Sequence, residues 1–127
     1  MQSTTQKIGI LAEQIAQKYL KDKAYKILSV NYKKPWGEVD IIAQKDNCIN
    51  FVEVKASSQN RGSFGPELRV NKNKFFHIVR TAESFLQDND LTNMEWQIDI
   101  VSVSFSDNWQ KATIQHFKKI NEDNFSF

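Results

Sequence analysis

Apolar residues recur at helical spacing in two stretches of the chain. Between Thr5 and Asp22 they form one stripe, which predicts an amphipathic helix whose start is capped by a hydroxyl group of residues 3–5. A second stripe predicts a helix over residues 71–88, with Asn71 as its N-cap. The stripes consist of Ile8, Leu11, Ala12, Ile15, Ala16, Tyr19 and Leu20 in the first helix, and of Phe75, Ile78, Val79, Ala82, Phe85 and Leu86 in the second.

Segments that alternate between polar and apolar residues, or are apolar throughout, predict five strands. Turn residues around Pro35 and at Asp46-Asn47 separate the first three strands. The strands are expected over residues 26–32, 38–44, 48–56, 95–105 and 111–117.

Successive residues of a strand point to opposite faces of its sheet. Glu53 and Lys55 therefore share one face of the third strand, and Val52 and Val54 share the other. In the second strand, one face is expected to hold Val39, Ile41 and Ala43, and the other face is expected to hold Glu38, Asp40 and Ile42. In the third strand, Ile49 and Phe51 are expected to lie on the same face as Glu53.

The order αβββαββ predicts one α/β domain over residues 1–127, with a central mixed sheet flanked by helices and a frayed tail from residue 121. With 40% hydrophobic and 25% charged residues, the composition is that of a globular protein. The single cysteine, Cys48, excludes an intramolecular disulfide, and no apolar stretch is long enough for a membrane span or a signal peptide. We therefore expect a cytoplasmic protein that has no membrane partner.

Charge is unevenly distributed along the chain, although the net charge is only +2. Residues 37–55 carry −2, whereas the flanking segments 1–36 and 56–86 carry +5 and +3. An acidic strip between basic segments is the layout of a site that holds a metal at its centre and phosphate around it. Ordinary surface charge is the alternative, which charge alone favours.

Two carboxylates and an ammonium group are expected to meet on the hairpin that turns at Asp46-Asn47. Its antiparallel arms bring Asp40, near the start of one strand, beside Glu53, toward the end of the next, and Lys55 projects on the side of Glu53. Adjacent carboxylates repel each other unless a cation lies between them. Mg²⁺ prefers one or two carboxylates, with water or phosphate oxygens in its remaining positions. The set therefore suits hydrolysis of a phosphodiester, with Lys55 orienting water or stabilising charge on phosphorus.

Several of these residues also have a plainer interpretation. A solvated strand face with a cross-strand salt bridge would explain Asp40, Glu53 and Lys55, but the apolar residues around them predict a buried hairpin, where charges without a partner are rare. Glu13 lies at the edge of the first helical stripe among small residues, which places it either at the core boundary or in solvent.

Residues of the second helix and the aromatic turn leave similar alternatives open. Lys72 and Lys74 lie at the positive end of the helix dipole, which indicates an anionic partner unless both are simply solvated. His77 and His116 have no metal-ligand partner at a useful spacing, so we interpret both as structural or exposed. Trp36 is either a packing residue or a surface on which a base stacks.

Two motifs occupy the arms of the hairpin: Gly37-Glu38-Val39-Asp40-Ile41-Ile42-Ala43 and Phe51-Val52-Glu53-Val54-Lys55. They resemble the PD-(D/E)XK, or restriction-endonuclease-like, signature, and more closely the YraN family of uncharacterised endonuclease-like proteins, which is similar to archaeal Holliday-junction resolvases. The resemblance covers nearly the whole chain. It includes Gly9-x-x-Ala12-Glu13-x-x-Ala16-x-x-Tyr19-Leu20, Asn31, Phe64-Gly65, Val70-x-x-x-Lys74 with Ala82, and Asp99 in Ile98-Asp99-Ile100-Val101.

The resemblance implies a restriction-endonuclease-like fold and a Mg²⁺ (or Mn²⁺) cofactor. We expect an endonuclease that hydrolyses phosphodiester bonds in DNA, with branched or structured DNA as a candidate substrate. A homodimer is left open, because resolvase-like relatives are often dimers. The resemblance assigns Asp40, Glu53 and the Val54 carbonyl to the metal, Lys55 to catalysis, Glu13 to a position facing the metal, and Glu38 and Lys74 to auxiliary roles; the basic residues expected to contact nucleic acid are Lys33, Lys34, Arg61, Arg69, Lys72 and Lys74.

The chain departs from the family pattern at three positions where relatives often carry arginine. Lys33 keeps a charge without the forked geometry that suits phosphate, and Ser57 and Gln97 carry no charge. These departures favour the alternative of a non-catalytic nucleic-acid-binding or protein-interaction module that retains the nuclease fold. The intact carboxylate and lysine set of the hairpin favours the nuclease.

Overall fold

The computed structural model describes residues 3–58 and 72–122, and within them the elements follow in the predicted order. Each begins and ends within two residues of its expected bounds. Ser3 caps the first helix through a capping box with Gln6, whereas Asn71, the expected cap of the second helix, lies outside the described residues. The elements are α1 (Thr4–Asp22), β1 (Lys26–Lys34), β2 (Gly37–Lys45), β3 (Cys48–Ser58), α2 (Lys72–Asp88), β4 (Glu95–Phe105) and β5 (Ala112–Phe117).

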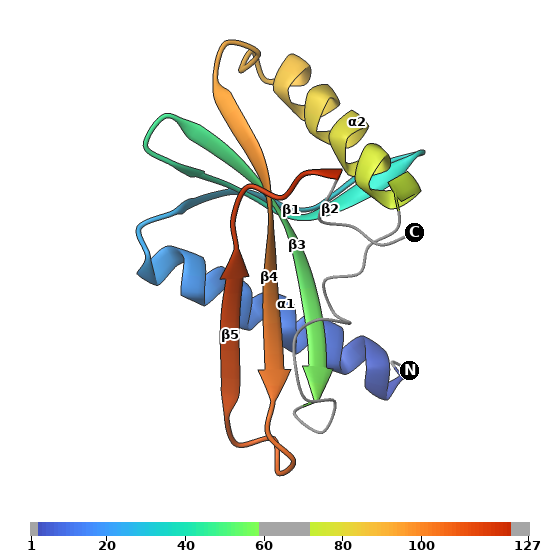
Figure 1. The fold of residues 1–127 in the computed structure, drawn as a ribbon, viewed down its shortest axis with the longest axis vertical. Helices are drawn as coiled ribbons and strands as arrows, with labels where there is room; N and C mark the ends of the chain where they lie inside the picture. Colours follow the sequence, from blue (N-terminus) through green and yellow to red (C-terminus); the bar gives the residue numbers. More distant parts are fainter. Residues whose placement is uncertain (1–2, 59–71, 123–127) are drawn as a thin grey trace.

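The five strands of the described residues form one mixed sheet in chain order, β1-β2-β3-β4-β5 (Figure 1). Neighbouring strands are antiparallel except β3 and β4, which run parallel. A parallel pair needs a crossover connection, and α2 lies in the connection between these two strands. This arrangement brings α2 back against β2, beside the two arms of the predicted hairpin.

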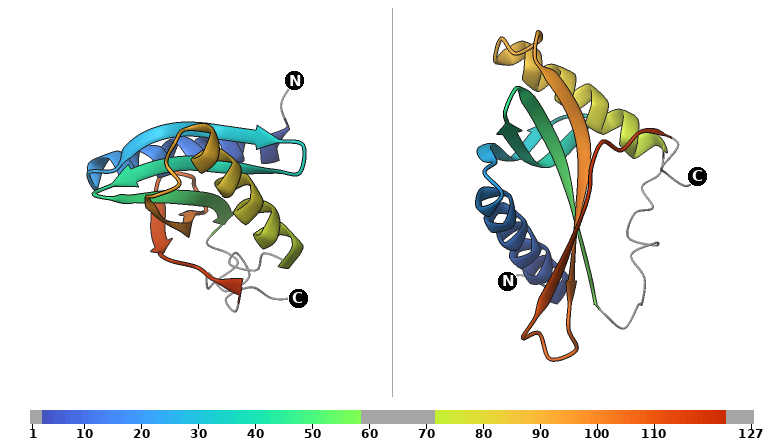
Figure 2. Two further views of the ribbon diagram at one scale, coloured as in Figure 1. Left: turned by 90° about the horizontal axis from the view of Figure 1, so that it is seen from above. Right: turned by 60° about the vertical axis from the view of Figure 1, so that its left-hand side comes forward.

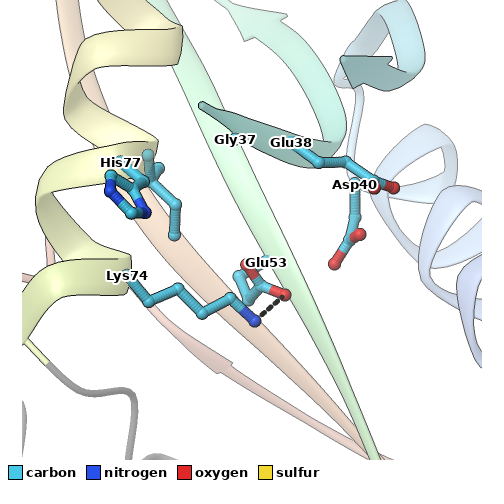
Figure 3. Close-up of a pocket in the computed structure, with 7 residues that line it drawn as sticks. Gly37, Glu38, Asp40, Glu53, Lys74 and His77 are labelled. Carbon is cyan, nitrogen blue, oxygen red and sulfur yellow. Dashed lines mark hydrogen bonds and ion pairs between the residues drawn. The ribbon is translucent and has the colours of Figure 1, made fainter. Parts of the chain in front are cut away.

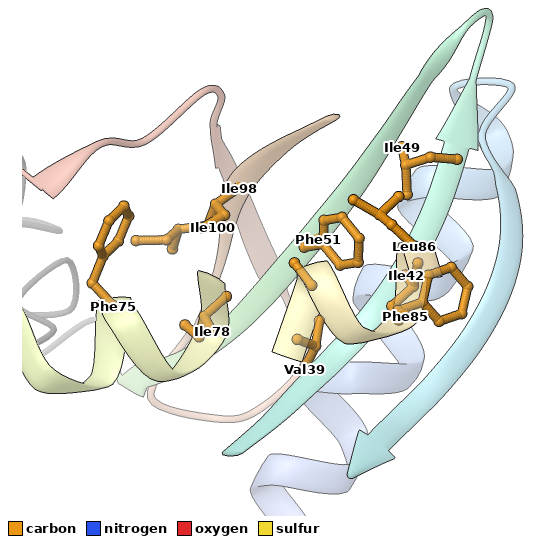
Figure 4. Close-up of a cluster of buried hydrophobic side chains, with 11 residues drawn as sticks. Val39, Ile42, Ile49, Phe51, Phe75, Ile78, Phe85, Leu86, Ile98 and Ile100 are labelled. Atoms are coloured by element: carbon orange, nitrogen blue, oxygen red, sulfur yellow. The ribbon is translucent and has the colours of Figure 1, made fainter. Parts of the chain in front are cut away.

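The two helices cover opposite faces of the sheet (Figure 2), and each face has its own buried cluster. The stripe predicted for α2 is confirmed, because all of its residues pack in the cluster on that face. The α1 side holds Ala12, Ala16, Leu20, Tyr25, Ile41, Ala43, Val52, Val101, Val103 and Phe105, and the α2 side (Figure 4) holds Val39, Ile42, Ile49, Phe51, Phe75, Ile78, Ala82, Phe85, Leu86, Ile98 and Ile100.

The stripe of α1 is narrower than its sequence predicts. Ala12, Ala16 and Leu20 are fully buried, whereas Leu11 is exposed. Small alanine side chains let the helix approach the sheet along one row, and Leu11 lies about 100° around the helix from Ala12. Within the part of the chain that the structure describes, neither helix is long and apolar enough to cross a membrane.

The alternation predicted for β2 is wrong at Val39. The prediction grouped Val39 with Ile41 and Ala43, but Val39 packs with Ile42 on the α2 side, while Ile41 and Ala43 lie on the α1 side. Val39 and Ile41, which are two positions apart and would share a face in a regular strand, therefore lie on opposite faces of the sheet. The strand makes an irregular step at Asp40, which lies between them.

This step coincides with the place where β2 separates from β3. The described pairing between the two strands ends at Ile41↔Val52. On the other side of β2, Asn31 of β1 adopts a φ of 51°, in the left-handed region, which interrupts regular strand geometry there. Irregular steps of this kind re-aim side chains. The carboxylate of Asp40 turns toward β3, where its Oδ2 accepts a hydrogen bond of 2.8 Å from the backbone N–H of Val54.

Candidate functional site

A cavity of about 320 Å³ lies where β2 separates from β3, and α2 closes its other side. Asp40 of β2 and Glu53 of β3 point into the same space, and Lys74 reaches toward Glu53 from the start of α2 (Figure 3). The two carboxylates thus come together as the hairpin predicted. The cavity is lined by Gly37, Glu38, Asp40, Glu53, Lys74, His77 and Ile78.

Glu53 is the most firmly held acidic residue of the cavity. Its backbone pairs with Ile100 of the parallel neighbour β4, and its side chain is only 9% exposed. The predicted alternation of β3 is confirmed, because Phe51 lies on the α2 side with Glu53, and Val52 on the α1 side. Glu53 Oε1 lies 3.3 Å from Lys74 Nζ and accepts a hydrogen bond from it. This ion pair joins the sheet to α2 inside the cavity.

Asp40 carries the most strongly perturbed carboxyl group described in the cavity. Burial raises its pKa, repulsion by Glu53 and a hydrogen bond with the Glu53 side chain raise it further, and the result is a pKa of about 7. The backbone N–H of Val54 and the charge of Lys74 act in the opposite direction. Two carboxylates this close are hard to ionise together without a cation between them.

The two lysines near Glu53 differ in what they experience. Burial lowers the pKa of Lys55; the charge of Glu53 opposes this, and the neighbouring charge of Lys74 adds to the lowering. Burial also disfavours the charge of Lys74, but Glu53 outweighs it and raises the pKa of Lys74. Lys55 projects on the Glu53 side of β3, as expected, although it is absent from the described lining of the cavity.

Glu13 approaches Asp40 from α1, on the other side of the gap between the strands. Burial raises its pKa first, and the charges of Asp40 and Glu38 raise it further. Its Oε1 is buried and makes no hydrogen bond in the described structure. The prediction that Glu13 lies at the core boundary, and not in open solvent, is confirmed. No donor among the described residues satisfies this oxygen, so it is open to water or to a cation.

The donor set fits a hard divalent cation. Asp40 and Glu53 offer adjacent carboxylate oxygens, and Glu13 offers an unsatisfied one nearby. Among residues 3–58 and 72–122, no three His, Cys, Asp or Glu side chains are arranged to hold an ion by themselves. A cation here would therefore use the carboxylate pair and complete its shell with water or phosphate oxygens, which is the way Mg²⁺ binds. Val54, whose carbonyl was the further expected ligand, contacts Asp40 through its N–H.

The basic residues expected to contact nucleic acid have different surroundings. Lys33 is exposed, and its charge lowers the pKa of Glu13, so it lies near the acidic cluster. Lys34 forms an ion pair of 3.1 Å with Asp88 at the end of α2. Lys72 is exposed at the first position of α2. Two of the expected contacts, Arg61 and Arg69, and most of the loop over residues 57–69, lie outside the described residues.

His77 lines the cavity, which sequence reasoning missed. Its position three residues after Lys74 on the same helix was the available signal, since residues three apart share a helix face. Trp36 is occupied by packing, because the guanidinium of Arg80 lies 4.0 Å from the centroid of its ring. Gly37, the next residue, brings the turn so close to α2 that an added Cβ would lie 2.8 Å from Thr81 Oγ1.

A second polar cluster lies on the opposite face, around the fully buried Asp99. Asp99 accepts hydrogen bonds from Asn50 Nδ2 at 3.1 Å, Gln97 Nε2 at 2.9 Å and the Lys119 backbone N at 3.0 Å. His116 Nε2 lies 2.9 Å from its Oδ2. Burial works against the Asp99 charge, but these hydrogen bonds outweigh it and lower the pKa. His116 is therefore structural, and Gln97, one of the departures from the family pattern, supports Asp99 away from the cavity.

Comparison with known proteins gives the chain a family. The model of a family described as "Uncharacterised protein family UPF0102" matches residues 12–103, well over half of the chain. The chain belongs to the UPF0102 (YraN) family. The matched segment of this UPF0102 protein contains every described residue that lines the cavity, and Glu13 as well.

Other members of UPF0102 are similar to this chain over most of their own length. The UPF0102 protein of Fervidobacterium nodosum is 40% identical over 116 residues, which are 89% of this chain and 80% of the relative. That of Alkaliphilus oremlandii is 39% identical over 115 residues, or 88% of this chain and 95% of the relative. A UPF0102 protein of Sulfurihydrogenibium sp. is 42% identical over 100 residues, or 78% and 84%.

Proposed function

We propose that this UPF0102 protein is a divalent-metal-dependent endonuclease of the PD-(D/E)XK, or restriction-endonuclease-like, type. Its substrate would be nucleic acid, DNA in the first place, and branched or otherwise structured DNA is the form to test first. One observation carries the proposal: Asp40 and Glu53, from two adjacent strands, line one cavity so closely that the charge of Glu53 opposes ionisation of Asp40. A protein seldom buries such a pair unless a ligand compensates the repulsion.

In this proposal, Asp40 and Glu53 hold Mg²⁺ or Mn²⁺, and Glu13 supports it from α1. A bound ion of this kind polarises a phosphoryl group and lowers the pKa of coordinated water. Asp40 is oriented for this role by the N–H of Val54, and Glu53 by the sheet. Lys55, whose pKa is lowered by burial, orients the attacking water or stabilises charge on phosphorus from the Glu53 side.

The test has a binding arm and a cleavage arm. Mn²⁺ is titrated into wild type, Asp40→Asn and Glu53→Gln while the melting temperature is followed, with Asp107→Asn, at an exposed turn position, as the matched control. Cleavage is then measured with Mn²⁺ on duplex, single-stranded, flap and four-way-junction DNA. We expect stabilisation and cleavage in wild type and in Asp107→Asn, and neither in the two cavity variants. Wild type and Glu53→Gln being equally silent in both arms would overturn the proposal.

The second candidate function is a non-catalytic nucleic-acid-binding or protein-interaction module. The observation in its favour is that the described residues contain no group of three metal-binding side chains, so the ion would have two direct carboxylate ligands, with Glu13 only nearby. This candidate predicts that DNA binds without any metal-dependent cleavage, and that Asp40→Asn binds DNA as well as wild type does. The cleavage arm with its cavity variants therefore separates the two functions.

A further inference from the structure

The Lys74–Glu53 ion pair lies where the proposed cation would bind. Lys74 Nζ is 3.3 Å from Glu53 Oε1, inside the cavity lined by Asp40 and Glu53. Figure 3 shows the lysine side chain extended from α2 toward the carboxylate, on the side of Glu53 that faces the cavity. An ammonium group thus provides positive charge beside the carboxylate pair.

The two partners of this ion pair differ in freedom. The side chain of Glu53 is 9% exposed and sits on a strand paired within the sheet, whereas that of Lys74 is 45% exposed on a helix near its first turn. A long, half-exposed lysine can rotate toward solvent without disturbing the core. Glu53 cannot leave without moving β3. If the pair separates, Lys74 is the residue that moves.

A divalent ion and the Lys74 ammonium group compete for the same carboxylate oxygens. An ion bound to Glu53 would lie about 2 Å from its oxygen, and Lys74 Nζ already lies 3.3 Å from Oε1. Two cations this close repel each other, by Coulomb's law, by an amount that matters even in a water-like dielectric. Among the ion pairs of the described residues, the one that Glu53 forms is with Lys74, whereas Lys55 lies two residues along the same strand.

We infer that Lys74 is the resident counter-ion of Glu53 and is displaced from it when a divalent cation binds. This inference rests on the proposed function, because it takes the cavity to be a metal site. Displacement would leave the ammonium group at the mouth of the cavity, where it can pair with a phosphate oxygen of the substrate. Lys74 is then a positioning residue that weakens binding of the ion in the absence of substrate.

The test measures Mn²⁺ affinity by isothermal titration calorimetry at pH 8, without nucleic acid. The variants are Lys74→Met, which keeps most of the length of the side chain but removes its charge, and Lys74→Arg, which keeps the charge. Lys21→Met, at an exposed position of α1, is the matched control for loss of one lysine. We expect Lys74→Met to bind Mn²⁺ at least about fivefold more tightly than wild type. Lys74→Arg and Lys21→Met should bind as wild type does.

A second readout keeps the test valid if a variant is less stable. In EDTA, Lys74→Met should melt below wild type, because Glu53 loses its partner, and saturating Mn²⁺ should raise its melting temperature by more than it raises that of wild type. Unchanged or weaker Mn²⁺ binding by Lys74→Met, while wild type binds and Asp40→Asn does not, would overturn the role of Lys74 alone. Absence of Mn²⁺ binding in wild type would overturn the proposed function and this inference together.

Discussion

At the scale of single residues, Asp40 and Glu53 are placed by different means. Glu53 follows the regular alternation of a strand, so its direction could be predicted from the sequence. Asp40 sits where the alternation of β2 is broken, and its carboxylate is held by hydrogen bonds with the Val54 backbone N–H and the Glu53 side chain. The same break leaves Asp40 buried beside a second carboxylate, which raises its pKa to about 7. A group with such a shift links stability to pH.

The raised pKa of Asp40 predicts that the metal-free protein loses stability as the pH rises. The folded state binds a proton on Asp40 more tightly than the unfolded state, whose pKa is near 3.8, so this contribution is complete below about pH 4 and is lost by about pH 7. The Asp40→Asn side chain cannot ionise, so this variant should not lose stability in that pH range for this reason. Urea unfolding in EDTA at pH 5 and pH 7.5 should therefore show wild type declining relative to Asp40→Asn. If the free energies of unfolding of wild type and Asp40→Asn differ by the same amount at both pH values, the raised pKa of Asp40 is contradicted.

Gly37 predicts a second effect at the residue scale, on packing. A Cβ at this position would lie 2.8 Å from Thr81 Oγ1 and 3.2 Å from the His77 carbonyl oxygen, and the Thr81 hydroxyl donates a hydrogen bond of 2.7 Å to that carbonyl oxygen. Since Thr81 is fully buried, it cannot move aside easily. We expect Gly37→Ala to destabilise the fold by about 1–3 kcal/mol in urea unfolding.

The control for Gly37→Ala is the same substitution in α1. A Cβ at Gly9 meets nothing within 4 Å, and alanine is favoured over glycine inside a helix. Gly9→Ala should therefore stabilise the protein by about 0.5–1 kcal/mol. Equal destabilisation by both substitutions would mean that the contact of Gly37 with Thr81 is not tight enough to exclude a methyl group.

At the scale of the elements, the Asp99 cluster connects β3, β4 and β5 to α1 through hydrogen bonds. Asp99 of β4 is joined to Asn50 of β3 and to His116 of β5, and His116 Nδ1 lies 3.0 Å from the hydroxyl of Tyr19 in α1. These bonds connect segments that are far apart in the sequence. The sequence offered only isolated polar residues within strand patterns, so this cluster could not be predicted from them.

Removing the charge of Asp99 should weaken this connection. Asp99→Asn replaces an acceptor of four contacts by an amide that cannot accept them all, and buried donors without acceptors cost about 1–3 kcal/mol each. We expect Asp99→Asn to lower the free energy of unfolding by about 2–4 kcal/mol, measured with urea at pH 7. The exposed Asp107→Asn should lower it hardly at all. Because the pKa of Asp99 is lowered, this difference should shrink as the pH falls below about 4. A difference that persists at low pH would argue against the charge as its source.

The elements themselves were predictable because their signals are local. Periodicity marked both helices and all five strands to within two residues, and the hairpin brought Asp40 and Glu53 into one cavity. The reversal of Val39 was not predictable, because it depends on where β2 parts from β3. The position of His77 in the cavity was missed for a related reason: a helix face lines a cavity only once another element, here β2, supplies the opposite wall.

At the scale of the whole molecule, one sheet separates two buried clusters and holds the cavity at the seam between its strands. The α1 side brings Glu13 close enough to Asp40 for their charges to interact, and the α2 side reaches the cavity through Lys74. A site assembled from both sides works only if the two clusters fold together. The strands β2, β3 and β4 contribute side chains to both clusters, so a loss of packing in one cluster should also destabilise the other.

Leu20→Ala tests this coupling, since it truncates a fully buried side chain on the α1 side alone. The expected loss is about 2–5 kcal/mol. Trp96 packs against the cluster on the α2 side, and Trp36 lies under Arg80 of α2. Trp109 contacts Phe105 of the α1 side, so the experiment uses a Trp109→Phe background, in which tryptophan fluorescence reports on the α2 side. In a single cooperative unit, the fluorescence and far-UV circular dichroism transitions of Leu20→Ala move to lower urea together. A fluorescence midpoint that stays at the wild-type value while the dichroism shifts would show that the two sides unfold separately, and Asp40 would then lose its neighbour Glu13 before the cavity loses Lys74.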